Sequence, residues 1–328
     1  MKRIDLHSHV IPETIVQAWR EQPDLYKTKV EGEGHNRVFV RGKVRFDLIP
    51  EFYDADAKVE SMDRKKLDIS YISPGPQTFF YGFKGEQAGK TARLVNEGIA
   101  RMVNARPDRL RGMATLPMQE PELAIAELER VVKEYQFKAV ELGTAIGDEE
   151  LADPKFRPVL KRAQELKVMI FAHPNTQGSA GRLDCYYLTN LIGNPLDTTI
   201  MVGKLMFSGA LDELPDLKIL LAHGGGFLPY QIGRFEHGHT VRPDTSAVTK
   251  TSPMEMFKRF YFDALTHSPQ AIRHLIDVVG SERVVIGTDS PFDMGEEHPV
   301  ERLEAVPGLT QKEREDISYR TAQRLVGE

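Results

Sequence analysis

Five polar side chains each stand at the carboxyl end of a short apolar run: His7, His9, His173, His223 and Asp289. Imidazole nitrogens and carboxylate oxygens are ligands of Zn²⁺, and they also suit Fe²⁺, Co²⁺ and Mn²⁺. A histidine also gains and loses a proton near neutral pH. These residue types therefore indicate a divalent metal site with a histidine available for acid–base chemistry.

The spacing of these residues supports a metal site. His7 and His9 stand two residues apart, so on a strand they point to the same side. Three imidazoles and one carboxylate leave a coordination position open for water or substrate, which is typical of a catalytic metal. A single histidine at a strand end is often only hydrogen-bonded, whereas five such residues together predict a metal. The other histidines are expected to be peripheral: His35, His237, His239, His267, His274 and His298.

These residues need elements that bring them together. Eight apolar runs that alternate with helical patterns are predicted to be strands: Ile4–Leu6, Ile69–Ile72, Leu110–Leu116, Ala139–Leu142, Val168–Ala172, Ile219–Ala222, Phe260–Ala264 and Val284–Gly287. Eight such units predict an α/β fold, a (β/α)₈ TIM barrel, whose strands present their carboxyl ends on one face. An open doubly wound sheet is the alternative, but no GxGxxG surrounds the glycines at 224–226.

The stretch from about residue 10 to residue 53 does not follow this pattern. It contains short alternating pieces at Arg37–Val40 and Lys43–Phe46, which predict a small antiparallel β insertion after the first strand. No linker-like segment divides the rest of the chain, so we expect a single domain over residues 1–328.

Composition narrows the classes of partner. Lys and Arg number 43 against 48 Asp and Glu, a net charge of −5, so we expect no nucleic-acid partner. The single cysteine allows no intrachain disulfide and fits a reducing, cytoplasmic location. No apolar run approaches the ~18–20 residues of a membrane span, so no membrane association is expected.

Several motifs make the chain resemble a known family. His-Ser-His at 7–9, Phe-Ala-His-Pro at 171–174, Ala-His-Gly-Gly-Gly at 222–226 and Gly-Thr-Asp-Ser-Pro-Phe at 287–292 resemble the amidohydrolase superfamily. Residues 112–122 and 233–244 further resemble its decarboxylase branch. The resemblance covers nearly the whole chain and implies a distorted barrel that holds one divalent metal, usually zinc.

The resemblance also implies a role for each site residue. His7, His9, His173 and Asp289 would be the metal ligands, and His223 the catalytic histidine beside them. We add a second role for Asp289, as a proton carrier between the metal and the substrate. Arg45 and Arg242 are the predicted anchors of a substrate carboxylate, and Arg242 would reach the site of a neighbouring subunit, which implies a homodimer.

Two positions depart from the pattern of that branch. Arg45 is displaced by one position from the expected arginine, and Asn175 stands where a tryptophan normally follows the His-Pro pair. Both departures concern the pocket, so they predict related chemistry on a different substrate. We expect nonoxidative, metal-dependent decarboxylation of an unsaturated or aromatic acid, such as an aminocarboxymuconate semialdehyde or a hydroxybenzoate. A metal-dependent hydrolase or hydratase of a lactone, amide or enol acid is the alternative, and a nonenzymatic metal-binding barrel is a third hypothesis.

Overall fold

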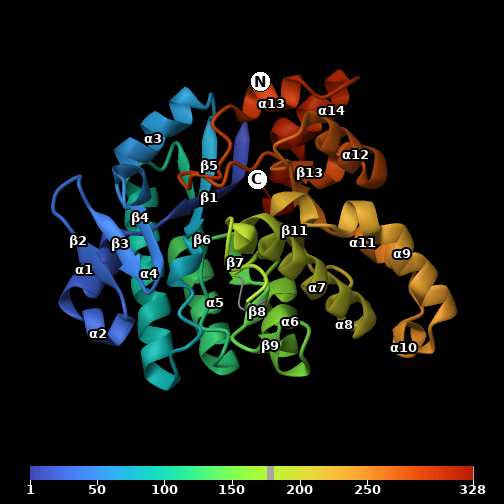
Figure 1. Cartoon of the computed structure of the whole chain (residues 1–328), viewed down its shortest axis with the longest axis horizontal. Coiled ribbons are helices and arrows are strands. Elements are labelled where there is room, and N and C mark those ends of the chain that lie inside the picture. Colours follow the sequence, from blue (N-terminus) through green and yellow to red (C-terminus); the bar gives the residue numbers. More distant parts are fainter. Residues whose placement is uncertain (176–180, 328) are drawn as a thin grey trace.

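Eight parallel strands form a barrel-shaped sheet with helices around its outside (Figure 1). The computed structural model describes residues 1–175 and 181–327. In spatial order the strands are β1 (Ile4–Val10), β5 (Ile69–Pro74), β6 (Leu110–Ala114), β7 (Ala139–Gly143), β10 (Met169–His173), β11 (Ile219–Leu221), β12 (Tyr261–Asp263) and β13 (Val284–Val285). Isolated parallel bridges join Asp5 to Ile286 and Ser8 to Ser290, so β1 meets the segment that follows β13 and the barrel closes there. The predicted distorted (β/α)₈ barrel is confirmed.

Helices connect successive strands and cover the outside of the barrel. They are α3 (Ala55–Arg64), α4 (Gly85–Ala105), α5 (Pro121–Tyr135), α6 (Arg157–Glu165), α7 (Asn194–Phe207), α8 (Ala210–Glu213), α9 (Leu228–Val241), α10 (Pro243–Ser246), α11 (Pro253–Phe257), α12 (Pro269–Val279), α13 (Pro299–Glu304), α14 (Gln311–Glu315) and α15 (Thr321–Val326). A short hairpin of β8 (Ala145–Ile146) and β9 (Glu149–Glu150) follows β7. Within the described residues, no helix has both the length and the apolar character to cross a membrane.

The insertion after β1 contains the predicted antiparallel strands. β2 (Lys29–Glu31), β3 (Val38–Arg41) and β4 (Val44–Asp47) form a three-stranded sheet beside the barrel, at the left of Figure 1. The insertion also has two helices that were not predicted, α1 (Glu13–Glu21) and α2 (Pro23–Tyr26). The fully buried Trp19 of α1 packs edge-on against Phe39 of β3, so contacts with the sheet stabilise this helix.

The barrel interior is filled by side chains from every strand of the sheet. The interior cluster includes Ile4 and Leu6 of β1 together with Phe171 of β10. Because side chains alternate between the two faces of a strand, an interior Leu6 would place His7 and His9 on the outer face of the barrel. However, the pairing of β1 with β5 shifts register between residues 5 and 8, and such an irregularity re-aims the side chains that follow it.

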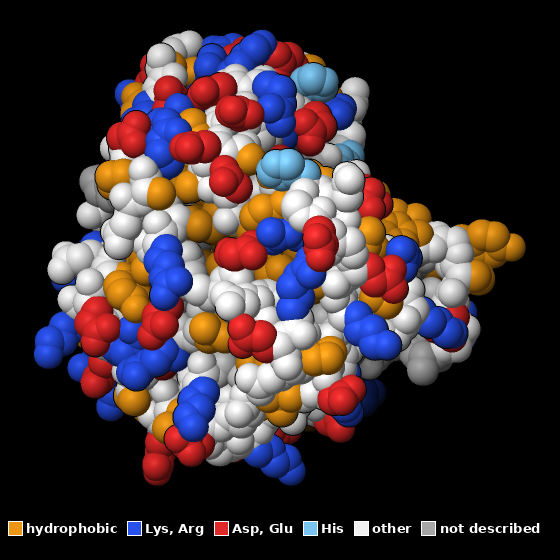
Figure 2. All heavy atoms as spheres, turned by 90° about the vertical axis from the view of Figure 1, so that its left-hand side faces the viewer, with side chains coloured by type: hydrophobic (Ala, Val, Ile, Leu, Met, Phe, Trp, Pro, Cys, Tyr) orange, Lys and Arg blue, Asp and Glu red, His pale blue; other side chains and the backbone are white. Residues whose placement is uncertain are grey.

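Charges of both signs are mixed over the molecular face on the insertion side (Figure 2). Lys and Arg side chains alternate there with Asp and Glu, and this face carries no large area of one sign. This distribution agrees with the modest net charge of −5.

Candidate metal centre

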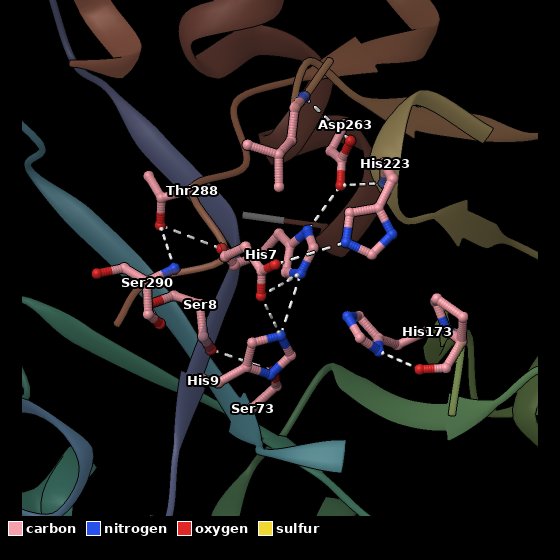
Figure 3. A network of polar contacts seen from close by, with 12 residues as sticks. His7, Ser8, His9, Ser73, His173, His223, Asp263, Thr288 and Ser290 are labelled. Atoms are coloured by element: carbon pink, nitrogen blue, oxygen red, sulfur yellow. Dashed lines mark hydrogen bonds and ion pairs between the residues drawn. The ribbon is translucent and has the colours of Figure 1, made fainter. Parts of the chain in front are cut away.

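The structure brings all five predicted site residues to the carboxyl end of the barrel, and Figure 3 shows the four histidines among them. His7 and His9 lie on β1, which extends through Val10 rather than ending before the histidines. His173 ends β10, His223 follows β11, and Asp289 lies beyond β13. Ligand atoms of His7, His173, His223 and Asp289 all lie within 4.8 Å of one another. His9 Nε2 lies 3.1 Å from His7 Nε2 and 3.0 Å from Asp289 Oδ1.

Hydrogen bonds at the far side of each ring determine which nitrogen faces the cluster. Nδ1 of His7 donates to Asp263 Oδ2 at 2.7 Å, and Nδ1 of His173 donates to the next carbonyl in the chain at 2.8 Å. Nδ1 of His9 lies 3.2 Å from Ser73 Oγ, which accepts its proton. With Nδ1 engaged in this way, the Nε2 atom of each ring faces the cluster, where it can bind a metal once it is unprotonated.

Burial and charge give this cluster the character of a cation site. Burial opposes ionisation of Asp289, but His7 and His223 hold the pKa of that carboxyl well below its usual range. Burial, together with the neighbouring His9 and His223, holds the pKa of His173 well below its usual value. Burial lowers the pKa of His7, yet the charge of Asp289 and the hydrogen bond to Asp263 outweigh it and raise that pKa to about 10.

Two buried atoms at the centre of this cluster have no hydrogen-bond partner among the described residues. They are Nε2 of His173 and Oδ1 of Asp289. An imidazole lone pair and an anionic oxygen in one buried cluster fit a divalent cation, because burying them without a partner is unfavourable. These residues therefore fit the metal that the sequence predicted.

Two acidic residues near the cluster were not singled out in the sequence. Asp263 of β12 accepts from His7 and also from the backbone N–H groups of His223 and Gly224, at 2.9 and 2.8 Å. Glu141 of β7 is completely buried, and its oxygens lie 3.6 Å from Nδ1 of His9 and 4.0 Å from Nδ1 of His173. The sequence could have indicated both residues, because each is an acidic residue within an apolar run that predicts a buried strand, and a buried acid is rarely without a partner.

The backbone is unusual at two of the site residues. His223 and Asp289 have φ values of 55° and 56°, in a region that side chains other than glycine seldom adopt. The glycines at 224–226 also have positive φ, and a Cβ at Gly225 would lie 2.7 Å from Phe262. The three glycines therefore allow a tight turn after β11 that packs closely against Phe262. This turn places His223 at the cluster.

A cavity of about 870 Å³ opens above the metal cluster. Its lining includes His173, Asp289 and Asn175, together with the aromatic side chains of Phe80, Tyr81, Tyr187 and Phe292. Asn175 therefore lies in the pocket, as the sequence comparison with the decarboxylase branch predicts.

Arg41 of β3 lies in the wall of this cavity, although the sequence gave no reason to select it. Its Nε donates to Thr28 Oγ1 at 2.7 Å and one terminal nitrogen donates to the Gln77 carbonyl at 2.8 Å. The other terminal nitrogen is buried and has no partner among the described residues. Burial lowers the pKa of Arg41 to about 10, so the guanidinium remains charged at neutral pH. It is therefore a buried cation in the cavity wall, with one terminal nitrogen that has no partner among the described residues.

The two arginines predicted from the sequence lie elsewhere. Arg45 is 57% exposed and pairs with Glu31 at 2.8 Å. Arg242 follows α9, is 68% exposed and pairs with Asp244 at 3.3 Å. Neither is among the described residues that line the cavity. Their role in substrate binding stays a prediction, and for Arg242 it requires a second subunit.

Comparison with known proteins identifies the family. A family model described as Amidohydrolase matches residues 4–327, so the chain belongs to the amidohydrolase family. The relatives include 2-amino-3-carboxymuconate-6-semialdehyde decarboxylase of Dictyostelium discoideum, 31% identical over 99% of this chain and 91% of the relative. Gamma-resorcylate decarboxylase of Polaromonas sp. is 30% identical over 82% of this chain and 86% of the relative. These relatives confirm the prediction of a decarboxylase of the amidohydrolase superfamily.

Solved structures agree with this assignment. A dihydroxybenzoic acid decarboxylase from Polaromonas sp. JS666, solved with manganese and the inhibitor 2-nitroresorcinol, superposes with a TM-score of 0.81 at 25% identity. The match covers 99% of this chain and 97% of that one. The 5-carboxyvanillate decarboxylase LigW from Sphingomonas paucimobilis shares the fold, with a TM-score of 0.84 at 22% identity and 99% coverage of both chains.

Proposed function

We propose that this chain is a metal-dependent, nonoxidative decarboxylase of an unsaturated or aromatic carboxylic acid. The observation that carries the proposal is the convergence of imidazole Nε2 atoms and the Asp289 carboxylate beneath a cavity that also contains Arg41. Aromatic side chains in the cavity wall suit a planar substrate. The guanidinium charge suits a carboxylate, to which its unpartnered terminal nitrogen can donate a hydrogen bond.

We further propose that His7, His9, His173 and Asp289 hold one divalent metal. When bound, this metal acts as a Lewis acid and orients the substrate. Zinc matches the nitrogen-rich donor set, and manganese is the competing candidate because a structural relative was solved with it. Elemental analysis of the purified protein distinguishes the two metals.

The reaction requires proton delivery as well as a metal. Loss of CO₂ breaks a carbon–carbon bond and leaves an electron pair on the substrate carbon. We assign to His223 the donation of the proton that this carbon takes up; its Nε2 lies beside the metal centre, 3.5 Å from Asp289 Oδ2. Asp289 is the proposed proton carrier between the metal and the substrate, while Arg41 holds a carboxylate of the substrate in place.

The assembly proposed for this function is a cytoplasmic homodimer of single-domain subunits. The segment from α9 to α11 projects at the right of Figure 1 and exposes apolar side chains, with Tyr230 84% and Val248 67% exposed. Exposed apolar patches of this kind mark contact surfaces. Arg242 lies on the same segment and would reach a partner's cavity from it. Sedimentation analysis in solution tests the dimer.

A direct assay tests the function. The metal-loaded protein should release CO₂ from hydroxybenzoates or muconate semialdehydes, and a chelator should abolish this release. His223→Ala should retain the metal while losing turnover, since its role is proton transfer rather than coordination. A metal-loaded protein that hydrolyses lactones but releases no CO₂ from any tested acid would overturn the proposal.

A further inference from the structure

Lys58 of α3 is a buried cation that contacts two segments of the metal centre. Its side chain is only 1% exposed. The ammonium nitrogen donates to the carbonyl oxygens of His9 and Ser290, both at 3.1 Å, and to Glu51 Oε1 at 3.2 Å. Its three N–H groups therefore have three acceptors. One of them is the carbonyl of the predicted ligand His9, and another is the carbonyl of Ser290, which directly follows the predicted ligand Asp289.

Glu51 extends these contacts to the insertion. It lies in a short helical turn at Pro50–Phe52, is 8% exposed and accepts a hydrogen bond from Ser290 Oγ at 2.5 Å. The same turn is bound to the end of β1, because Ile11 donates its N–H to the Phe52 carbonyl at 2.8 Å. The Lys58–Glu51 pair thus joins α3, the end of the insertion, β1 and the segment after Asp289.

These contacts lie where the barrel has its least regular pairing. β13 has two residues, and β1 meets the chain after it through isolated bridges and single hydrogen bonds, such as His9 N–H to Ser290 O at 2.7 Å. Across this junction Asp289 Oδ1 must lie within 3.0 Å of His9 Nε2. A shift of about 0.5 Å between the two segments is enough to degrade a metal site.

We propose that Lys58, through its ion pair with Glu51, is a positioning residue that fixes the spacing between His9 and Asp289 and so determines metal affinity. This inference rests on the metal centre of the proposed function. It requires no contact of Lys58 with metal or substrate, because both carbonyl acceptors belong to the backbone that carries the ligands. Loss of such an outer contact typically weakens metal binding 10- to 100-fold.

Lys58→Met tests the inference, with Lys65→Met as its matched control. Lys65 is also a buried lysine at the end of α3, 3% exposed, but its contacts are Ser61 Oγ at 2.7 Å and Glu297 at 3.0 Å rather than the backbone of a ligand segment. The dissociation constants for Zn²⁺ and Mn²⁺ are measured by chelator competition, beside thermal unfolding of each apoprotein. We expect Lys58→Met to weaken metal binding at least tenfold, whereas Lys65→Met lowers the unfolding temperature and changes affinity less than threefold.

A purely structural role for Lys58 gives a different result. In that case both variants lose stability and both bind metal within threefold of the wild type, which overturns the inference. If Lys58→Met does not fold, Glu51→Gln takes its place, since it retains the shape and removes the charge. We then expect at least threefold weaker binding, and unchanged affinity overturns the inference. A wild-type protein that binds neither metal would instead overturn the proposed metal centre.

Discussion

Asp263 determines how the His7 ring is presented to the rest of the metal centre. Its carboxylate accepts from Nδ1 of His7 at 2.7 Å, and backbone N–H groups after β11 hold the carboxylate itself (Figure 3). Burial opposes the charge of Asp263, but the hydrogen bond with His7 and its positive charge keep the pKa of Asp263 below its usual range. This carboxylate therefore stays charged and keeps the proton of His7 on Nδ1.

Asp263→Asn should weaken divalent-metal binding 10- to 100-fold, because a neutral amide no longer fixes the ring and its tautomer as firmly. Metal titration against a competing chelator measures the effect. Asp316→Asn is the control, since Asp316 is also a buried carboxylate but binds Ser281 Oγ far from the metal centre. Equal metal affinity of the two variants would contradict this role for Asp263.

Arg41→Met should raise KM for a carboxylate substrate at least tenfold and leave metal affinity unchanged. A hydrogen bond to a charged group contributes about 1.5–3 kcal/mol, and about 1.4 kcal/mol corresponds to tenfold in binding. Steady-state kinetics compares this variant with Arg45→Met, which removes the exposed arginine predicted from the sequence. A larger rise in KM for Arg45→Met would assign the substrate carboxylate to Arg45 instead.

The limits of sequence analysis are clearest for the side chains of Asp263 and Arg41. His7, His9, His173, His223 and Asp289 were recognisable because each follows an apolar run. Asp263 acts on His7 from 256 residues away, so only the folded barrel makes them neighbours. Arg41 and Arg45 lie on neighbouring strands of one small sheet, and the packing of that sheet on the barrel decides which arginine enters the cavity.

At the scale of elements, strand order was predictable and local irregularities were not. Continuous apolar runs mark strands that are buried on both faces, which is why all eight were found. The register shift in β1 has no sequence signature, yet it allows Leu6 to join the interior while His7 and His9 face the metal centre. The helices of the insertion were missed because they depend on contacts with the small sheet.

Helix α14 illustrates an element whose stability depends on pH. Its preceding residue Thr310 forms a reciprocal capping pair with Glu313, and Glu313 also binds Arg273 at 2.8 Å. The hydrogen bond from Arg273 lowers the pKa of Glu313 to about 2, and it outweighs burial, which raises that pKa. Because the folded pKa lies below the unfolded value, this contribution to stability is present at neutral pH and is lost as pH falls from about 4.5 to about 2.

Glu313→Gln should lower the free energy of unfolding by about 1–2 kcal/mol at pH 7, a value reduced to allow for solvent screening at the surface. The difference from wild type should shrink steadily below about pH 4.5 and vanish near pH 2. Urea denaturation across this range measures it. Glu86→Gln, which removes an exposed partner of Lys90, should have no comparable pH-dependent effect. A difference that grows on acidification would contradict the assignment.

At the scale of the whole molecule, the metal centre joins distant parts of the chain. The predicted ligands lie at residues 7, 9, 173 and 289, near the beginning, the middle and the end of the sequence. A cation that binds them only in the folded state adds about 2.7 kcal/mol when its free concentration is 100 times its dissociation constant.

Removal of the metal should therefore lower the thermal unfolding temperature by several degrees, and readdition of Zn²⁺ or Mn²⁺ should restore it in a concentration-dependent manner. Differential scanning calorimetry with and without chelator measures the change. Asp289→Ala should unfold at the same temperature under both conditions, because it lacks one ligand. If the unfolding temperature of the wild type is the same with and without chelator, the proposed centre is contradicted.

The closing contacts between β1 and residues 286–290 also constrain how the protein is synthesised. The first strand leaves the ribosome early, but its second neighbour is made only when most of the chain has been translated. Until then one edge of β1 has unpaired backbone groups, and such edges invite pairing with other chains. The nascent, open sheet is therefore exposed to such pairing until its last strand has been made.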